Sequence, residues 1–173
     1  LHFPMPKRAF EFISADWFEV NGGKFLVIVD WYSGWYEVAG PIANPDSTRF
    51  IQSLRDWFVN KAVPDYLVTD TGPPFGSSEV ADFLKRWKIS WSPSSPYYAQ
   101  GNGIAEHAVF NAKSLLRKVW KKGERSPMSN DEWIKDILQY RNTPNKSTKL
   151  SPAIMIFGHA IQDNLPAHKS ALD

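Results

Sequence analysis

The first forty residues alternate between apolar stretches and turn-forming residues in the manner of consecutive β-strands. In the stretch FEFISADWFEV, Phe10, Phe12, Asp16 and Phe18 share one side of an extended chain. The next stretch, KFLVIVDWY, is apolar almost throughout, which is typical of a central strand buried on both faces. The turn-forming stretches NGG and SG separate the strand-like segments. We therefore expect an antiparallel meander of three strands, at residues 10–20, 24–32 and 35–40.

Further along the chain, helical and strand-like spacings alternate. Phe50, Leu54 and Trp57 recur at the helical period after Ser47, which can cap that helix. Later helices are expected to begin at Ser77 or Ser78, to run from about Asn102 to Lys121, and to start at a capping box of Ser129 and Glu132. Short strands are predicted at residues 65–70 and 88–92. The order βββαβαβα predicts an α/β fold with a five-stranded mixed sheet flanked by helices.

The composition is that of a globular domain. The 173 residues are 43% hydrophobic and 22% charged, so we interpret residues 1–173 as one domain, and as a fragment of a longer protein because the first residue is Leu1. No run of about 18 apolar residues indicates a membrane span. The absence of cysteine excludes disulfides and cysteine-based zinc sites within these residues. A net charge of +2 gives no bulk attraction to nucleic acid, so any such contact must depend on local charge.

Three acidic residues stand out by their positions. Asp16 lies inside the first predicted strand, where an unpaired carboxylate is costly to bury, so it needs a partner, a metal or solvent. Asp70 ends a strand at the sheet edge where ligand sites gather, although aspartate is also an ordinary turn residue. Glu106 shares a polar stripe of the long helix with Lys113 and Arg117. This stripe indicates either a solvated face or a binding site behind the glycine-rich loop.

The spacing of these acids and the stretches around them resemble the catalytic core of retroviral and gypsy-class LTR retrotransposon integrases. Asp70 and Glu106 are separated by 35 residues, and a strand aspartate precedes them. Four stretches agree with that family in the same order: FLVIVDWYSGW, VTDTGPPF, SPYYAQGNGIAE and YRNTPNKSTKLSPAIMIFG. The resemblance covers nearly the whole chain, and it is more specific than the spacing alone.

This resemblance implies a ribonuclease-H-like fold and a DNA polynucleotidyl transferase with associated endonuclease activity. By family analogy, the enzyme processes the 3′ ends of element DNA and transfers them into target DNA. The resemblance assigns catalysis and metal binding to Asp16, Asp70 and Glu106, which would hold two Mg²⁺ ions, with Mn²⁺ as a substitute. It also implies action in the nucleus, after a cytoplasmic stage before import.

Several positions depart from the family pattern, although all three acids are retained. Thr71 and Pro74 stand where the family usually has Asn and Gln, and Tyr98 and Ala99 replace His and Pro in the active-site loop. His107 stands where Arg is common. This pattern suits either a divergent element or a host-domesticated copy.

Further residues are candidates for DNA contact. Tyr97, Gln100, Asn102 and Lys113 match family positions that touch the element end, and the Tyr97 ring can stack on an unpaired base. A local basic series adds Arg117, Lys118, Lys121, Lys122 and Arg125. These residues are equally compatible with an ordinary loop and with a helix end where cations complement the dipole.

Two other functions stay open. The chain can be a domesticated, catalytically weak or inactive domain that binds DNA or a host protein partner, or a general ribonuclease-H-like nuclease that cuts RNA–DNA hybrids. The long loop and the stretch LSPAIMIFG favour an integrase over that nuclease. The family context also predicts a homodimer, with Trp17, Trp31, Trp35 and Trp57 as core or dimer surface. Asp30 is interpreted as a hairpin acid rather than a fourth metal ligand.

Overall fold

Five strands and five α-helices make up the residues that the computed structural model describes, 5–93 and 99–163. The strands are β1 (Phe12–Val20), β2 (Gly23–Asp30), β3 (Tyr36–Ala39), β4 (Tyr66–Val68) and β5 (Ser90–Ser92). The helices are α1 (Ser47–Asn60), α2 (Ser78–Arg86), α3 (Ala99–Val119), α4 (Asp131–Arg141) and α5 (Pro152–Phe157), with a 3-10 turn at Pro127–Ser129. The predicted order βββαβαβα is confirmed. Within the described residues, no helix is long and apolar enough to cross a membrane.

The strands form one mixed sheet in the order β3-β2-β1-β4-β5. β1, β2 and β3 are antiparallel neighbours, whereas β4 pairs in parallel with β1, and β5 pairs in parallel with β4. Parallel neighbours need a crossover connection, and α2 provides the one between β4 and β5. This topology confirms both the meander and the α/β fold class predicted from the sequence.

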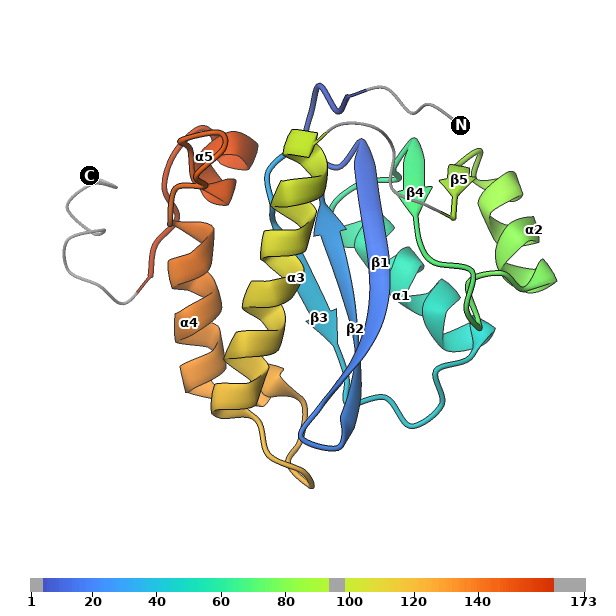
Figure 1. Ribbon diagram of the computed structural model, residues 1–173, viewed down its shortest axis with the longest axis horizontal. Helices are drawn as coiled ribbons and strands as arrows, with labels where there is room; N and C mark the ends of the chain where they lie inside the picture. The colour runs from blue at the N-terminus through green and yellow to red at the C-terminus, as the bar shows by residue number, and fades with distance from the viewer. Residues whose placement is uncertain (1–4, 94–98, 164–173) are drawn as a thin grey trace.

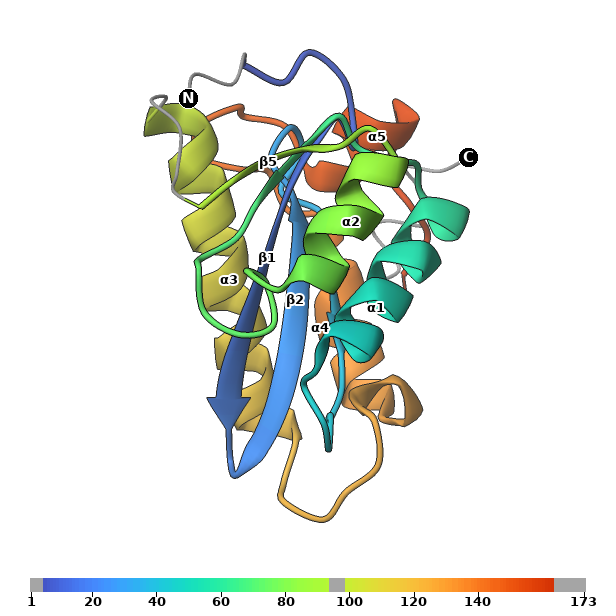
Figure 2. The ribbon, with the colours of Figure 1, turned by 90° about the vertical axis from the view of Figure 1, so that its right-hand side faces the viewer.

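Helices cover both faces of the sheet, so the molecule has three layers (Figure 1, Figure 2). α1 and α2 lie on one face, α3 lies on the other, and α4 packs beside α3. Each face has its own core, which includes Phe50, Leu54 and Phe83 on the first side and Ala108 and Leu116 on the second. Because β2 is buried between these two cores, its apolar stretch has no polar side.

β1 divides its side chains between the two cores. Phe12 belongs to the core on the α3 side, and Ile13 belongs to the core on the α1 and α2 side. Asp16 has the parity of Phe12 and therefore lies on the α3 side. The prediction that Phe10 shares this side is wrong. Phe10 precedes the strand with a φ of +68°, which turns its ring into the opposite core, edge-on to Trp57 with ring centroids 5.9 Å apart.

Two of the predicted helix caps are wrong by one residue. α1 is capped by Asp46, whose carboxylate accepts a hydrogen bond of 2.9 Å from a backbone N–H of the first turn, so Ser47 is already helical. α4 is capped by Asn130, and Ser129 ends the preceding 3-10 turn instead. In both cases the adjacent Asp or Asn is at least as good an N-cap as serine. Ser77 caps α2 as predicted.

The tryptophans divide between the core and its margin. Trp31, Trp35 and Trp57 are buried, so they belong to the core, which is the first of the two alternatives predicted for them. Trp17 is only half-buried and stacks on Phe75, with ring centroids 6.1 Å apart. Trp17 therefore packs β1 against the segment that follows Asp70.

The C-terminal end of α3 is attached to the turn between β1 and β2. Asn21 occupies this turn with a φ of +50°, and its side-chain amide donates hydrogen bonds to the carbonyl oxygens of Arg117 and Trp120. The Trp120 ring packs edge-on against Phe25, with centroids 5.0 Å apart. A Cβ atom on Gly23 would lie 2.5 Å from the same ring, so the close approach requires glycine. α3 thus crosses the sheet from an anchored end.

Candidate active site

The parallel pairing of β1 with β4 brings two of the predicted acids together. Ser14 pairs with Val68, and Asp16 and Asp70 each follow two residues later along their segments. Residues two apart share a side of an extended chain, so this register directs both carboxylates to the same region at the end of β4. The negative charge of Asp70 is close enough to perturb the ionisation of Asp16.

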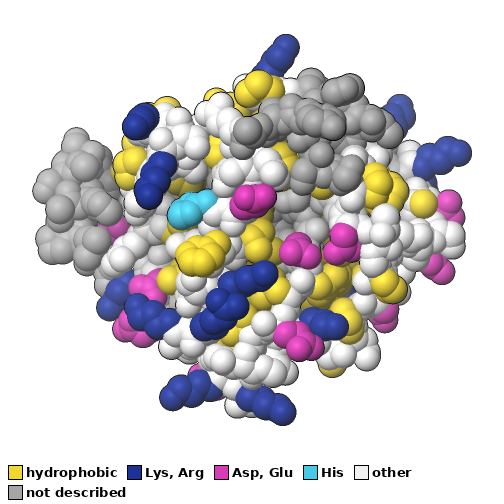
Figure 3. All heavy atoms as spheres, viewed as in Figure 1, with side chains coloured by type: hydrophobic (Ala, Val, Ile, Leu, Met, Phe, Trp, Pro, Cys, Tyr) yellow, Lys and Arg dark blue, Asp and Glu magenta, His cyan; other side chains and the backbone are white. Residues whose placement is uncertain are grey.

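α3 carries the third acid across the same region. Its buried side includes Ala108, Ala112 and Leu116, whereas Glu106 is exposed. Asp16 and Glu106 line one open pocket of about 330 Å³ between β1 and α3. Figure 3 shows acidic side chains near the middle of this face and basic side chains below them, over the lower part of α3. The fold therefore places the acids beside a positively charged surface.

The surroundings of Asp16 disfavour the charged form of its side chain. Burial raises the pKa of Asp16, the positive charge of Lys113 opposes the rise, and the negative charge of Asp70 adds to it. Lys113 lines the same pocket, and its ammonium lies 5.6 Å from the centre of the buried Phe18 ring. A carboxylate between a second acid and one lysine gains stability from added positive charge, such as that of a divalent cation.

The other two acids form hydrogen bonds within their own segments. The Oδ1 atom of Asp70 accepts a hydrogen bond of 2.7 Å from the N–H of Gly72, and the Oε1 atom of Glu106 accepts one of 3.2 Å from the Asn102 amide. Within the described residues, no three acidic, histidine or cysteine side chains converge closely enough to hold a metal. The donor set itself fits Mg²⁺, because three carboxylates supply the oxygen ligands that this ion prefers. Each of these hydrogen bonds uses one carboxylate oxygen, so the second oxygen of Asp70 and of Glu106 can serve as a metal ligand.

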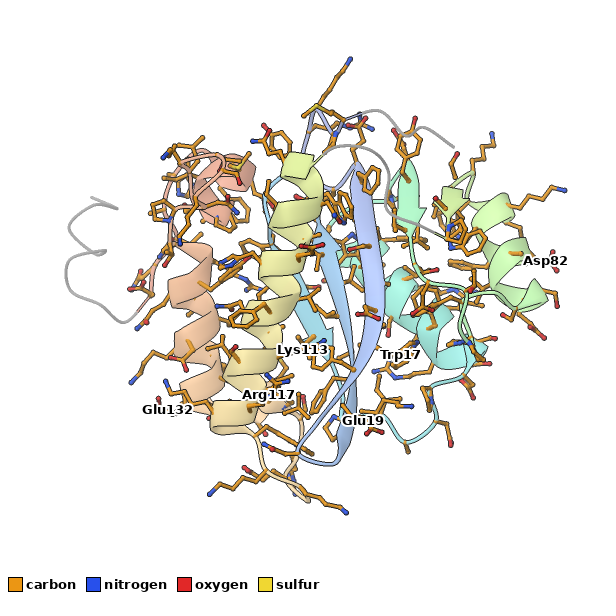
Figure 4. The ribbon with its side chains drawn as sticks, in the orientation of Figure 1. Trp17, Glu19, Asp82, Lys113, Arg117 and Glu132 are labelled. Carbon is orange, nitrogen blue, oxygen red and sulfur yellow. The ribbon has the colours of Figure 1, made fainter. Side chains whose placement is uncertain are left out.

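The predicted DNA contacts are spread along α3. This helix begins earlier than predicted, so Gln100 and Asn102 both lie in its first turn. Gln100 is exposed, and so is Arg117 near the other end of the helix. Figure 4 shows Lys113 extending from α3 toward the sheet and Arg117 further along the same helix. Tyr97 lies outside the described residues.

One member of the predicted basic series is engaged elsewhere. The Nζ atom of Lys118 lies 3.4 Å from a carboxylate oxygen of Asp136, so this lysine links α3 to α4. The adjacent Arg117 forms no ion pair with the carboxylates of the described residues. Only part of the basic series is therefore available to a ligand.

Four residues that line the pocket were missed by sequence reasoning. They are Ser14 on β1 and Ala105, Val109 and Phe110 on α3. Phe110 is 66% exposed, which is unusual for so large an apolar side chain. It follows Glu106 by four residues, and residues four apart meet on one side of a helix. This spacing is the sequence signal that could have identified Phe110.

Asp30 has a different environment from the three acids of the pocket. Its side chain is 0% exposed and accepts hydrogen bonds from the Phe10 N–H at 2.8 Å, the Ser33 N–H at 3.1 Å and the Ser33 hydroxyl at 2.6 Å. Burial raises the pKa of Asp30 to about 6, and the hydrogen bonds limit that rise. These contacts support a role in the hairpin rather than in metal binding.

The arrangement of sheet and helices matches that of a known catalytic core. The catalytic core domain of BIV integrase superposes with a TM-score of 0.68, over 86% of this chain and 95% of that one. The two sequences are 17% identical, so this likeness establishes the fold alone. The fold is the ribonuclease-H-like fold, a five-stranded mixed sheet with helices on both faces, as predicted.

Sequence comparison then defines the family. Residues 6–99, more than half of the chain, match the family described as "Integrase core domain", and the chain belongs to this family. It is 35% identical over 150 residues to the Pro-Pol polyprotein of Feline foamy virus, covering 86% of this chain and 12% of that protein. It is also 34% identical over 98 residues to the Gag-Pro-Pol polyprotein of Mouse mammary tumor virus (strain BR6), covering 57% of this chain and 6% of that protein. The chain thus spans only a small part of these relatives.

Proposed function

We propose that this chain is the catalytic core of an integrase, a DNA polynucleotidyl transferase that trims the 3′ ends of element DNA and joins them to target DNA. One observation carries the proposal: Asp16 and Glu106 line a single pocket, and Asp70 lies close enough to perturb Asp16. A gathering of carboxylates such as Asp16 and Asp70 is unfavourable without a cation, because like charges repel. Membership of the integrase core domain family supports a role for these carboxylates in polynucleotidyl transfer.

Both proposed reactions are displacements at phosphorus. In the first, a water oxygen bonds to a phosphorus near the 3′ end of the element DNA, and the bond from that phosphorus to the 3′ oxygen breaks. The released fragment carries the phosphate, and the element DNA keeps a free 3′-hydroxyl. In the second, this hydroxyl oxygen bonds to a target phosphorus, and the target's own 3′ oxygen leaves and takes up a proton. The second reaction exchanges one phosphodiester bond for another, so it needs no external energy source.

We assign Asp16, Asp70 and Glu106 as the residues that hold two Mg²⁺ ions, for which Mn²⁺ can substitute. When bound, the ions would activate the attacking oxygen and stabilise the charge on the leaving oxygen. Lys113 now lies near Asp16, where its positive charge opposes the effect of burial. With a cation held by that carboxylate, Lys113 would be available to bind a DNA phosphate.

The exposed side of α3 is the proposed DNA track. Gln100 and Asn102 lie at the helix start, and Lys113 and Arg117 follow on the way to its other end. Amide side chains can bond phosphates and base edges, and each cation that neutralises a phosphate adds salt-dependent affinity. Tyr97 stays in the proposal as a base contact. By the same family context we propose a homodimer that acts in the nucleus, and a monomeric mass in light scattering at all concentrations would contradict the dimer.

Strand transfer on a branched DNA substrate with Mn²⁺ tests the proposed function directly. Wild-type protein is expected to join the strands. Glu106→Gln is expected to lose at least about 100-fold in rate, because an amide has no negative charge for a metal. Glu79→Gln is the matched control, since Glu79 is an exposed glutamate on α2 away from the pocket. It should keep wild-type activity.

The same experiment distinguishes the alternative function. If neither wild type nor Glu106→Gln joins DNA while Mn²⁺ binding is intact, the chain is a domesticated domain that binds DNA or a protein partner. Thr71 and Pro74 keep this second candidate open, because they stand in the turn after Asp70 where the family usually has Asn and Gln. Efficient cutting of an RNA–DNA hybrid without strand transfer would instead indicate a general nuclease.

A further inference from the structure

Phe110 places an exposed aromatic ring inside a charged pocket. Its side chain is 66% exposed, although it lines the pocket with Asp16, Glu106 and Lys113. The hydrophobic core under α3 is formed by other residues of the helix, so the ring contributes little to it. An exposed aromatic ring next to acidic and basic side chains is suited to a ligand that has both charge and a flat apolar face.

The helix fixes where this ring lies relative to its neighbours. At about 100° per residue, Phe110 lies about 40° around the helix from Glu106, and Lys113 lies about 20° from Glu106 on the other side. All three therefore project from one side of α3, with Phe110 one turn after the proposed metal ligand. The Lys113 ammonium lies 5.6 Å from the centre of the Phe18 ring on the sheet, whereas the Phe110 side chain is 66% exposed.

We propose that Phe110 stacks on an unpaired nucleobase at the end of the DNA substrate. This inference rests on the proposed function and adds a substrate contact to it. Trimming the 3′ end of one strand leaves bases of the opposite strand without partners, and the faces of those bases are free to stack. Stacking between an aromatic side chain and a base depends little on sequence, because every base has a π-face. Lys113 would hold an adjacent phosphate and so orient the backbone of the same end.

A fluorescent base tests the contact without any turnover. The probe is a short duplex with 2-aminopurine in an unpaired 5′ overhang, mixed with the protein in Ca²⁺ so that no strand is cut. Stacking on Phe110 is expected to quench the probe in wild type. Phe110→Ala is expected to abolish the quenching and to weaken binding of this DNA by at least about fivefold. Phe110→Trp should retain both, because its ring also stacks.

Two controls separate stacking from a general effect on the surface. Phe157→Ala removes another exposed aromatic side chain, 51% exposed on α5, and should bind and quench as wild type does. A blunt duplex offers no unpaired base, so wild type and Phe110→Ala should bind it equally. If Phe110→Ala quenched the probe as strongly as wild type does, the proposal would be overturned. A change in the mass of Phe110→Ala in solution, with DNA binding unaltered, would also overturn it, because the ring would then be a protein contact.

Different experimental results would refute the stacking contact and the proposed function. Phe110→Ala should raise the KM for overhang DNA in strand transfer and leave kcat within about twofold of wild type, because the ring binds substrate and takes no part in the displacement. Glu106→Gln should show the reverse: it should lose turnover and keep the quenching. Full activity of Glu106→Gln would refute the proposed function and leave the stacking result standing. An absence of quenching in wild type would refute the stacking contact, whatever the activity.

Discussion

Asp30 and Asp16 lie on neighbouring strands of the sheet, and the chain surrounds their carboxylates in opposite ways. Asp30 is enclosed in its hairpin by hydrogen bonds from Phe10 and Ser33. Asp16 faces Lys113 and a second acid, Asp70, at the border of an open pocket. The hairpin region is complete without a ligand, whereas the α3 side of β1 has negative charge that its one nearby lysine only partly balances.

This difference separates an acid that stabilises the fold from an acid that is available for chemistry. A carboxylate that already accepts backbone and hydroxyl hydrogen bonds secures a turn and gains little from a cation. A carboxylate that interacts with another acid becomes more stable when a cation arrives. The same criterion applies to two adjacent cations on α3, since Lys118 is paired with Asp136 and Arg117 is exposed.

Asp16→Asn should abolish activity and leave the fold intact. We expect strand transfer to fall by about a thousandfold, equivalent to about 4 kcal/mol in the barrier, because the variant lacks a charge needed to hold the metal. The free energy of unfolding should stay within about 1 kcal/mol of wild type, because the lost charge was poorly compensated. Activity assays and urea unfolding of the same preparation measure both quantities. A stability loss as large as that of an Asp30 variant would remove the distinction between the two acids.

Asp30→Asn should have the opposite effect and act on stability. At pH 7 we expect it to lower the free energy of unfolding by about 2 kcal/mol, because an amide has fewer acceptor sites for the three donors. In a chain of this size that loss lowers the melting temperature by about 4–8 °C.

The pH dependence of the same variant provides an internal check. Burial raises the pKa of Asp30 to about 6 in the folded protein, above its ordinary value of 3.8. The native state therefore holds more protons between these two values, and wild-type stability should fall as pH rises through them, by up to about 1.4 kcal/mol per pH unit. Asp30→Asn should lack this slope in unfolding curves measured from pH 4 to pH 7. An unchanged slope would mean that another group controls the pH response.

Divalent metal should stabilise one region and not the other. A tenfold excess of Mg²⁺ over its dissociation constant should add about 1.4 kcal/mol to the stability of wild type, or about 3–6 °C in melting temperature. Asp30→Asn should show the same shift from its lower starting point, whereas Asp16→Asn should show little or none. Thermal melting with and without metal measures all three. Equal shifts in the two variants would place the metal away from the pocket.

The smallest effect is expected from the adjacent cations of α3. The slope of log affinity against log salt for duplex DNA is negative. Arg117→Ala should make this slope less steep by about 0.9, the amount for one lost phosphate contact. Lys118→Ala should change the slope much less, because its ammonium is paired with Asp136. Binding titrations at four or five salt concentrations measure the slopes. Equal slopes for the two variants would argue against a DNA track on this side of the helix.

Much of the fold could be predicted because it depends on local patterns. The alternation in β1 and the apolar run in β2 are direct consequences of which faces of the sheet are buried. Helix starts were less predictable, because Asp46 and Asn130 were better placed as caps than the neighbouring serines. Phe10 was misplaced for a different reason: strand parity fails where the backbone adopts a positive φ.

The candidate site depended on information that no local pattern contains. Asp16, Asp70 and Glu106 were identified by their resemblance to a family and by spacing, and the two aspartates meet only because β1 and β4 pair in parallel. The interaction of Lys113 with Asp16 likewise requires α3 to cross β1 at a particular height. Phe110 was missed because an aromatic residue in a helix is usually part of the core, although it lies four residues after Glu106 and its side chain is 66% exposed.

The attachment of α3 at Asn21 helps to set the position of the helix relative to β1. Asn21 holds the carbonyl oxygens of Arg117 and Trp120 against the turn that ends β1. Asp16 lies on that same strand, whereas Glu106 lies toward the other end of α3. The separation between the two carboxylates therefore depends on this attachment of α3 to β1. A substitution at Asn21 that shifted α3 against β1 would therefore change the gap between the two carboxylates, even though Asn21 lies several turns of helix away from Glu106.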